Sequence, residues 1–345
     1  MITVAFFSNK GDVGKTALLY HVAWALSDLN VRVLVADLDP QANLTTLCLG
    51  EARLEQLWSV DEGQRQTIAG AVYDLREGLG DLGSPPAAPV SDLSPVQPEP
   101  VSDRLGLLVG DIALATFEAK LAEAWPRCLD RHAPSHRLTS AFYRAITGAA
   151  RDWGAQVALI DVGPGLGAIN RAALIAAEWV LTPLNADLVS IQGLRNLGPT
   201  LRQWRDEWAE RRSCSPLPEA SRPTGTMAPA GYVVVQPNLY GGHVTKAYNT
   251  WLDRIPREYA SAFDLSGDDE HIVGRYGLPV VKHYRSLMAM AREARKPLFH
   301  LTPADGALGA HATTARDAGK EFRELARLLA GRIGLELPRP AVGAA

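Results

Sequence analysis

The chain has 345 residues, a hydrophobic fraction of 47% and a formal net charge of −3, which suits one large α/β domain or two smaller ones and argues against a globally basic protein. The apolar run MITVAFF has no basic segment before it and is short for a signal peptide, and no window approaches the roughly 18 continuous apolar residues of a membrane span. The cysteines Cys48, Cys128 and Cys214 form no CxxC pair, which predicts a cytoplasmic protein without a disulfide framework or a cysteine metal site.

The first part of the chain predicts a strand, a loop, a helix and a second strand. The strand ITVAFFS is followed by a helix from about Lys15 to Leu29, in which apolar residues recur at helical spacing. The second strand, VRVLVADLD, has the dense aliphatic character of a buried parallel strand. Because parallel strands need a right-handed crossover between them, this pattern indicates an open, mostly parallel sheet.

Residues 82–102 form a proline-rich segment, with prolines at six positions. Proline cannot donate a backbone hydrogen bond, so this segment cannot be a regular helix or an interior strand. We interpret it as an exposed excursion within one domain spanning residues 1–335, because strand-like patterning resumes at residues 104–111. A second irregular loop is predicted at residues 213–229, and residues 336–345 are expected to form a C-terminal tail.

Beyond the proline-rich segment, strands and helices are predicted to alternate. Strands are predicted at residues 155–161, 178–184, 231–236 and 279–282. Helices are predicted near residues 168–177, 188–212 and 315–331, and from about Thr245. The sequence therefore predicts an α/β fold with a twisted, mainly parallel sheet and helices on both faces.

The loop after the first strand, SNKGDVGKT at residues 8–16, has the composition of a phosphate-binding loop. In such loops glycines let backbone N–H groups turn onto the phosphates, a lysine reaches the β- and γ-phosphates, and a Ser or Thr hydroxyl holds Mg²⁺. Gly14, Lys15 and Thr16 meet these requirements. The general pattern fails five residues before Gly14, where the chain has Asn9, and a second lysine, Lys10, stands inside the loop.

The stretch KGDVGKT resembles the deviant Walker A motif, KGGxGK(S/T), of the ParA/MinD family of P-loop ATPases. Further stretches are similar to family motifs in the same order, namely DLDPQANLT (37–45), RLGLLVGDIALATFEAKL (104–121), VALIDVGPGLG (157–167) and AALIAAEWVLTPLNADLVSIQGLRNL (172–197). The similar stretches end near residue 210, and the DPQxN motif resembles that of ParA-type (Soj-like) partition proteins. The resemblance implies a P-loop NTPase-like fold and slow, Mg²⁺-dependent ATP hydrolysis.

The resemblance also implies roles for individual side chains. Lys15 binds phosphate oxygens, Thr16 and Asp161 hold Mg²⁺, and Asp39 positions the attacking water. Asp37 either lies near the metal or makes a strand-end hydrogen bond, and both alternatives remain open. The implied nucleotide-binding residues are Lys10, Gly11, Asp12, Val13, Gly14, Lys15, Thr16 and Ala17 in the loop, and Gln236, Pro237 and Asn238 beside the adenine.

Two residues of the loop bear on turnover. In the family, the lysine matching Lys10 reaches across an ATP-bound homodimer to the partner's phosphates, in the manner of an arginine finger. Asp12 stands where the family has glycine, close to negatively charged phosphates. Asp12 pairs with Lys10, faces solvent without effect, or is an engineered substitution. We favour weakened dimerisation or hydrolysis, and the alternative function is a non-hydrolysing nucleotide-binding interaction module of the same fold.

Basic residues gather at 271–300, with six Lys or Arg against a single Glu. ParA-type proteins bind DNA without sequence preference through phosphate contacts, so the resemblance implies a DNA surface. The alternative is that these residues only solvate helix faces. The candidates for DNA contact are Arg195, Arg202, Arg205, Arg285, Arg292, Arg295 and Lys296.

The last predicted helix, near 315–331, has one apolar face, which favours docking on the protein's own sheet over lying on a membrane. The implied partners are a second copy of the chain around ATP, non-specific DNA, and an activating protein (ParB-like) or cargo adaptor. We expect no membrane partner, and a cytoplasmic location with nucleoid association left open.

Overall fold

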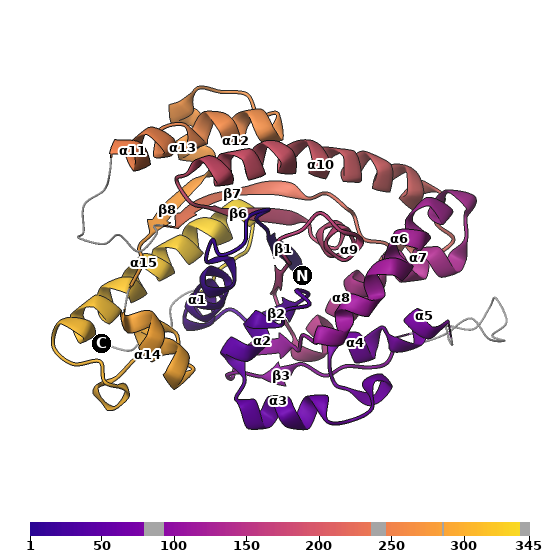
Figure 1. The fold of residues 1–345 in the computed structure, drawn as a ribbon, viewed down its shortest axis with the longest axis horizontal. Helices are drawn as coiled ribbons and strands as arrows, with labels where there is room; N and C mark the ends of the chain where they lie inside the picture. Colours follow the sequence, from indigo (N-terminus) through magenta and orange to yellow (C-terminus); the bar gives the residue numbers. More distant parts are fainter. Residues whose placement is uncertain (79–92, 236–245, 285, 339–345) are drawn as a thin grey trace.

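The computed structural model describes residues 1–78, 93–235, 246–284 and 286–338, and its centre is one eight-stranded sheet (Figure 1). The strand order is β3-β4-β2-β5-β1-β6-β7-β8, and neighbouring strands are parallel except for β3 and β4. The strands are β1 (Ile2–Phe6), β2 (Val33–Asp37), β3 (Glu99–Pro100), β4 (Leu105–Leu108), β5 (Val157–Asp161), β6 (Trp179–Leu184), β7 (Ala228–Val235) and β8 (Gly277–Val281). The predicted α/β class with a mainly parallel sheet is confirmed.

The helices connect these strands. They are α1 (Lys15–Asp28), α2 (Asn43–Cys48), α3 (Glu51–Trp58), α4 (Ile68–Ala71), α5 (Tyr73–Glu77), α6 (Glu118–Arg127), α7 (Ala133–Thr139), α8 (Ala141–Trp153), α9 (Ala168–Ile175), α10 (Leu188–Ser213), α11 (Lys246–Leu252), α12 (Ile255–Phe263), α13 (Asp269–Tyr276), α14 (Ser286–Ala294) and α15 (Ala310–Ile333). Short 3₁₀ turns are η1 (Glu62–Gln64), η3 (Ile112–Phe117), η4 (Cys128–Asp130), η5 (Glu219–Ser221), η6 (Leu298–His300) and η7 (Pro303–Asp305). Within the described part of the chain, none of these helices combines enough length and hydrophobicity to span a bilayer.

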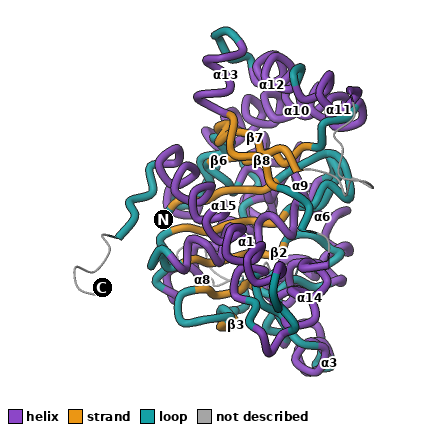
Figure 2. Tube along the Cα trace, turned by 90° about the vertical axis from the view of Figure 1, so that its left-hand side faces the viewer, coloured by secondary structure: helices purple, strands orange, loops and turns teal. Residues whose placement is uncertain are grey.

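Helices cover both faces of the sheet (Figures 1 and 2). Successive residues of a strand point to opposite faces, so Val4 and Phe6 of β1 join one buried cluster while Ala5 joins the other. The first cluster includes side chains of α1, α14 and α15, and the second includes side chains of α6, α8, α9, α10 and α12. Because both faces are covered, the central strands are mostly apolar, with Asp37 and Asp161 at the ends of β2 and β5.

The described part of the proline-rich segment differs from the exposed excursion predicted for it. Val96 is buried in the core, and Glu99 and Pro100 form β3, which pairs antiparallel with β4 at the edge of the sheet. Proline is tolerated there because an edge strand has one side without a hydrogen-bonding neighbour. Residues 82–92 of the segment lie outside the described residues.

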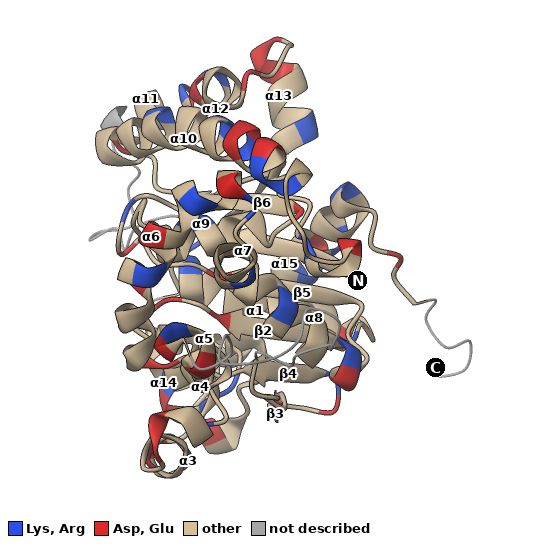
Figure 3. Cartoon of the chain, turned by 90° about the vertical axis from the view of Figure 1, so that its right-hand side faces the viewer, with Lys and Arg blue, Asp and Glu red and all other residues tan. Residues whose placement is uncertain are grey.

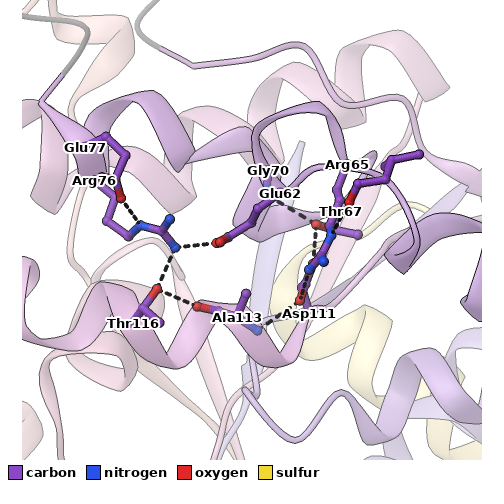
Figure 4. Close-up of polar contacts among 10 residues, drawn as sticks. Glu62, Arg65, Thr67, Gly70, Arg76, Glu77, Asp111, Ala113 and Thr116 are labelled. Carbon is purple, nitrogen blue, oxygen red and sulfur yellow. Dashed lines mark hydrogen bonds and ion pairs between the residues drawn. The ribbon is translucent and has the colours of Figure 1, made fainter.

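A polar network fastens the segment from η1 to α5 to the turn after β4 (Figure 4). Asp111, which is 2% exposed, accepts hydrogen bonds from Thr67 Oγ1 at 2.9 Å and from Ala113 N at 2.9 Å. Arg65 Nη1 lies 3.2 Å from the same carboxylate. A second arginine, Arg76, donates to Thr116 Oγ1 at 2.6 Å. These contacts attach a segment of short helices to the end of a sheet strand.

The parallel register brings three loops to one edge of the sheet. Phe6 of β1 and Asp37 of β2 are both in register with Asp161 at the end of β5. The segments that follow these three strands therefore leave the sheet side by side. In open α/β sheets, ligands bind at the carboxyl ends of the strands.

Candidate functional site

The phosphate-binding loop joins β1 to α1 and takes the left-handed backbone conformation twice. Gly14 has φ 82°, and a side chain there would be strained. Asp12 has φ 55° and is exposed. Asp and Asn enter this region more readily than other non-glycine residues. Residue 12 therefore has a left-handed backbone conformation, which glycine favours and aspartate tolerates. This is the condition under which Asp12 can face solvent without effect.

Lys15 and Thr16, at the start of α1, both contact Asp161. The Lys15 Nζ donates to Asp161 Oδ1, and Thr16 Oγ1 donates to Asp161 Oδ2 at 2.8 Å. Lys15 and Asp161 are buried, and a buried charge is tolerated only when it is paired. The structure thus brings together three of the predicted site residues, from two elements that are far apart in the sequence.

Asp37 makes strand-end hydrogen bonds, which is one of the two roles predicted for it. Its carboxylate accepts from Thr45 N at 2.8 Å and from Asp39 N at 3.3 Å. Burial, and then the neighbouring charge of Asp161, raise the pKa of Asp37 above its ordinary value. Gly110 also packs against it, because an added Cβ would lie 2.8 Å from Asp37 Cγ.

Asp39 follows β2, lines the same cleft as the phosphate-binding loop and is 4% exposed. Its Oδ1 accepts from Gln41 N at 3.0 Å. The loop after β5 passes close by, since a Cβ on Gly163 would lie 3.3 Å from Asp39 Oδ1. Asn170 holds this loop by donating to the carbonyl oxygens of Gly163 and Gly165, both at 2.8 Å. The carboxylate predicted to position water is therefore fixed beside the segment that follows Asp161.

Glu118 caps the helix that follows this loop, a role that the sequence did not reveal. Its carboxylate accepts from Ala168 N at 2.5 Å and from Ile169 N at 2.8 Å, at the first turn of α9. An anionic cap satisfies backbone donors and complements the helix dipole. Glu118 lies in the 104–121 stretch that resembles a family motif, but nothing local to that stretch predicts a partner 50 residues away.

Lys10 forms its ion pair with Asp187, at the N-cap of α10. The Asn185 side-chain amide has one orientation in which both its oxygen and its nitrogen form hydrogen bonds. In this orientation the oxygen accepts from Lys10 Nζ at 3.2 Å and the nitrogen donates to Val235 O at 3.1 Å. Among the described residues Asp12 makes no ion pair. The alternative in which Asp12 neutralises Lys10 is therefore wrong for this conformation, because Asp187 occupies that position.

A cleft of about 1050 Å³ runs over the phosphate-binding loop. It is lined by all of the loop residues from Lys10 to Ala17, by Asp39 and Pro164, and on its other side by Met288, Ala289, Arg292 and Glu293 of α14. A smaller cavity of about 360 Å³ adjoins it and is bounded by Gly14, Val235, Tyr284 and Phe322, among others. The residues predicted beside adenine, Gln236, Pro237 and Asn238, lie outside the described residues, directly after Val235.

The donor set at the cleft fits Mg²⁺. Thr16 and Asp161 offer hard oxygen atoms close together, and Asp37 lies beside Asp161 with a raised pKa that a divalent cation would lower. In the described part of the chain, no group of three or more His, Cys, Asp or Glu side chains could hold a metal by itself. A magnesium ion here would thus take few protein ligands, as Mg²⁺ does when phosphates and water complete its shell.

Three of the six arginines predicted to contact DNA are engaged within the protein. Arg195 pairs with Glu258 at 2.7 Å. Arg202 and Arg205 donate to the carbonyl oxygens of Ala262 and Met227. In Figure 3, acidic residues are interspersed with basic ones along α10 to α13.

The remaining candidates follow β8. Lys296 pairs with Asp305 at 2.8 Å, and a Cβ on Gly50 would lie 2.9 Å from Arg295 Nη1. Arg292 lines the cleft over the phosphate-binding loop. Arg285 lies outside the described residues. Among the described candidates, only Arg292 lines this cleft.

Comparison with known proteins agrees with this geometry. A family model described as an AAA domain matches residues 1–212. Protein IncC of Escherichia coli is 27% identical over 224 residues, which cover 63% of this chain and 50% of that protein. The chromosome-partitioning ATPase Soj of Thermus thermophilus is 31% identical over 202 residues, covering 59% of this chain and 62% of that protein. The chain thus spans only between half and two thirds of the length of these relatives.

Solved structures share the fold. A protein of Corynebacterium diphtheriae has a TM-score of 0.61 at 24% identity, covering 86% of this chain and 97% of that chain. The ATP complex of McdA from Cyanothece has a TM-score of 0.59 at 14% identity, covering 99% of both chains. Because the family model matches more than half of the sequence, the chain belongs to this AAA domain family, the family of ParA/MinD-type P-loop ATPases.

Proposed function

We propose that this protein is a partition-type ATPase that binds Mg²⁺-ATP, hydrolyses it slowly and uses it to switch between a monomer and an ATP-bound homodimer. The observation that carries the proposal is that Lys15, Thr16 and Asp39 line one cleft at the carboxyl edge of the sheet, while the buried Asp161 accepts from both Lys15 and Thr16. Phosphoryl transfer depends mainly on positioning and on charge stabilisation. These four side chains supply the groups that both tasks require.

Each residue has a distinct task in this proposal. Lys15 exchanges Asp161 for phosphate oxygens, because the two partners compete for one ammonium group. Thr16 and Asp161 hold Mg²⁺, which neutralises charge on the phosphates when bound. Asp39 accepts a hydrogen bond from the attacking water and so orients it. Glu118 and Asn170 act indirectly, by holding the loop beside Asp39 in place.

The dimer would form around the nucleotide, with Lys10 reaching the phosphates of the second copy. For this to happen, Lys10 must leave Asp187. Asp12 lies at the exposed tip of the loop and adds a negative charge there. We infer that Asp12 weakens dimerisation or turnover, because it would face the phosphates and the second copy.

The likeness to partition proteins supports a task in positioning DNA or a protein cargo, with an activating partner of the ParB kind. Among the relatives, Soj of Thermus thermophilus is described as a chromosome-partitioning ATPase. Non-specific DNA binding, a cytoplasmic location and nucleoid association remain part of the proposal. A non-hydrolysing nucleotide-binding module is the second candidate, and the Lys10–Asp187 ion pair together with Asp12 favours it.

The test combines phosphate release with solution mass. The chain, Asp12→Gly and Lys15→Ala are each measured with Mg²⁺-ATP and with Mg²⁺-ADP, by a phosphate assay and by light scattering. Lys320→Ala is the matched control, because Lys320 is an exposed lysine that pairs with Asp317 and does not line the cleft. We expect slow hydrolysis by the chain, none by Lys15→Ala, and a mass that doubles with ATP more readily in Asp12→Gly. ATP binding by the chain with no phosphate release, in both the chain and Asp12→Gly, would establish the non-hydrolysing candidate instead.

A further inference from the structure

Helix α14 forms one wall of the cleft over the phosphate-binding loop. Leu287 and Ala291 of this helix are buried in the core. The residues that line the cleft are Met288, Ala289, Arg292 and Glu293. Positions four apart share a helix face, so Met288 with Arg292 and Ala289 with Glu293 define one face of α14 that is turned to the nucleotide site.

The segment that follows α14 is held firmly. Lys296 Nζ contacts both carboxylate oxygens of Asp305, at 2.8 and 2.9 Å, and Asp305 completes a capping box with Thr302. Leu298 N donates to His21 Nε2, on α1, at 3.2 Å. The chain after α14 is thus tied to the helix that begins at Lys15, and this fixes the wall relative to the phosphate-binding loop.

Three cations line the cleft, and two of them already have carboxylate partners. Lys10 pairs with Asp187, and Lys15 pairs with Asp161. Arg292 is exposed and, among the described residues, forms no ion pair. The acidic residues that line the cleft are Asp12, Asp39 and Glu293. A nucleotide triphosphate would add several negative charges to this balanced set.

We propose that Arg292 is a phosphate-binding residue of the nucleotide site, supplied by the same chain from α14. The inference rests on the proposed function and adds a binding residue to it. Guanidinium groups suit phosphate because their planar donors pair with two oxygens at once. The positive charge of Arg292 also offsets the negative charge of Asp12. Asp12 stands at the loop position where the family has glycine. In this proposal Arg292 binds the nucleotide and is no longer a candidate for DNA contact.

The direct test is the affinity for a fluorescent ATP analogue, measured by titration on Arg292→Gln, Arg295→Gln and Lys15→Ala. Arg295 is the matched control, because it follows α14 closely but its guanidinium lies over Gly50. We expect Arg292→Gln to weaken binding about tenfold, a change of about 1.4 kcal/mol, and Arg295→Gln to leave it unchanged. The loss should shrink for the corresponding AMP analogue, which has no β- or γ-phosphate.

Each result decides something. If Arg292→Gln binds the ATP analogue as the chain does while Lys15→Ala does not, the role of Arg292 is refuted and the proposed function stands. If Lys15→Ala also binds normally, the proposed nucleotide site itself fails. If Arg292→Gln keeps ATP affinity but loses retention of random-sequence duplex DNA, Arg292 is a DNA contact. Because Arg292 is exposed, we expect its variant to keep the thermal midpoint of the chain.

A double-mutant cycle tests whether Arg292 offsets the negative charge of Asp12. In the Asp12→Gly background, the repulsion that Arg292 counters is absent, so Arg292→Gln should weaken ATP binding by a smaller factor than in the chain. Equal factors in the two backgrounds would overturn the coupling between the two charges. Raising the salt concentration should reduce the effect of Arg292→Gln, since interactions between exposed charges are screened.

Discussion

The ammonium group of Lys10 in the phosphate-binding loop contacts the carboxylate of Asp187, the residue that caps α10. Asp187 performs two tasks with its two oxygens, because Oδ1 also accepts from Ser190 N at 2.8 Å. The contact ties the loop to the turn after β6 and keeps Lys10 on its own chain. In the proposed dimer, Lys10 would have to leave this contact before it could reach the second copy.

Replacing Asp187 with asparagine should release Lys10 without damaging α10. Asparagine is as good an N-cap as aspartate, so the helix keeps its first hydrogen bond while the ion pair is lost. The side chains of Lys10 and Asp187 are 21% and 39% exposed, and such pairs are worth up to about 1 kcal/mol. We expect the ATP concentration that gives half-maximal dimer, measured by light scattering, to fall by up to about fivefold. An unchanged or higher concentration would show that Asp187 does not restrain Lys10. Asp187→Ala, which removes both the ion pair and the cap, shows what loss of the cap adds.

Nucleotide and metal should stabilise the fold together. A ligand that binds only the folded state raises the free energy of unfolding by about 2.7 kcal/mol at a concentration one hundred times its dissociation constant. We expect the thermal midpoint to rise with Mg²⁺-ATP and most of the rise to disappear when a chelator removes Mg²⁺. Lys15→Ala should show almost no rise, whereas Lys320→Ala should behave as the chain does. A full rise with ATP in chelator would place the metal outside the binding site.

Two glycines offer a matched test of the packing around α10. A Cβ on Gly198 would lie 1.8 Å from Ala262 O of α12, whereas a Cβ on Gly148 in α8 would meet nothing within 4 Å. Gly198→Ala should therefore lower the free energy of unfolding by about 3 kcal/mol through forced separation of the two helices. Gly148→Ala should raise it by up to about 1 kcal/mol, because alanine is the better helix former. Both values come from denaturant unfolding, and equal effects at the two positions would contradict this account of the α10–α12 contact.

The sheet and the phosphate-binding loop could be predicted from the sequence because their signals are local. Aliphatic runs mark the buried strands, and the loop carries its glycines and lysines within nine residues. The helix predicted from about Lys15 to Leu29 is α1, and the one predicted at 188–212 is α10. Short helices such as α4, of four residues, leave too few turns for a periodic pattern to show.

The partners of the site residues could not be predicted, because they depend on long-range contacts. Asp187 lies 177 residues from Lys10, and its own sequence context indicates only a helix cap. No helix is predicted at residues 286–294, where the structure has α14. On charge alone the sequence groups Arg292 with the DNA candidates, and only the fold brings it to the phosphate-binding loop.

His21 should make the stability of the protein fall in mild acid. Its ring links α1 to the segment after α14, with Nδ1 donating to Ala17 O at 2.7 Å and Nε2 accepting from Leu298 N at 3.2 Å. The bond from Leu298 N requires the neutral ring, because a protonated Nε2 cannot accept. Burial lowers the pKa of His21 from 6.5 to about 4, and the bond to Ala17 opposes this shift only in part. Between about pH 6.5 and pH 4, His21 is therefore protonated in the unfolded chain and neutral in the folded chain.

The sign follows from this difference in bound protons. As the pH falls from about 6.5 to about 4, the unfolded state binds more protons than the folded state, so the free energy of unfolding decreases, by about 3 kcal/mol in total. Above pH 6.5 both states are neutral at this position, and below about pH 4 both are protonated, so His21 adds no slope in either range. Denaturant unfolding at several pH values measures the slope, with His21→Leu to remove it and the exposed His271→Gln as control. We expect His21→Leu to be less stable at neutral pH, since Leu298 N loses its acceptor, yet to lose less stability on acidification. A slope between pH 6.5 and 4 that is the same in the chain and in His21→Leu would assign the acid sensitivity to other groups.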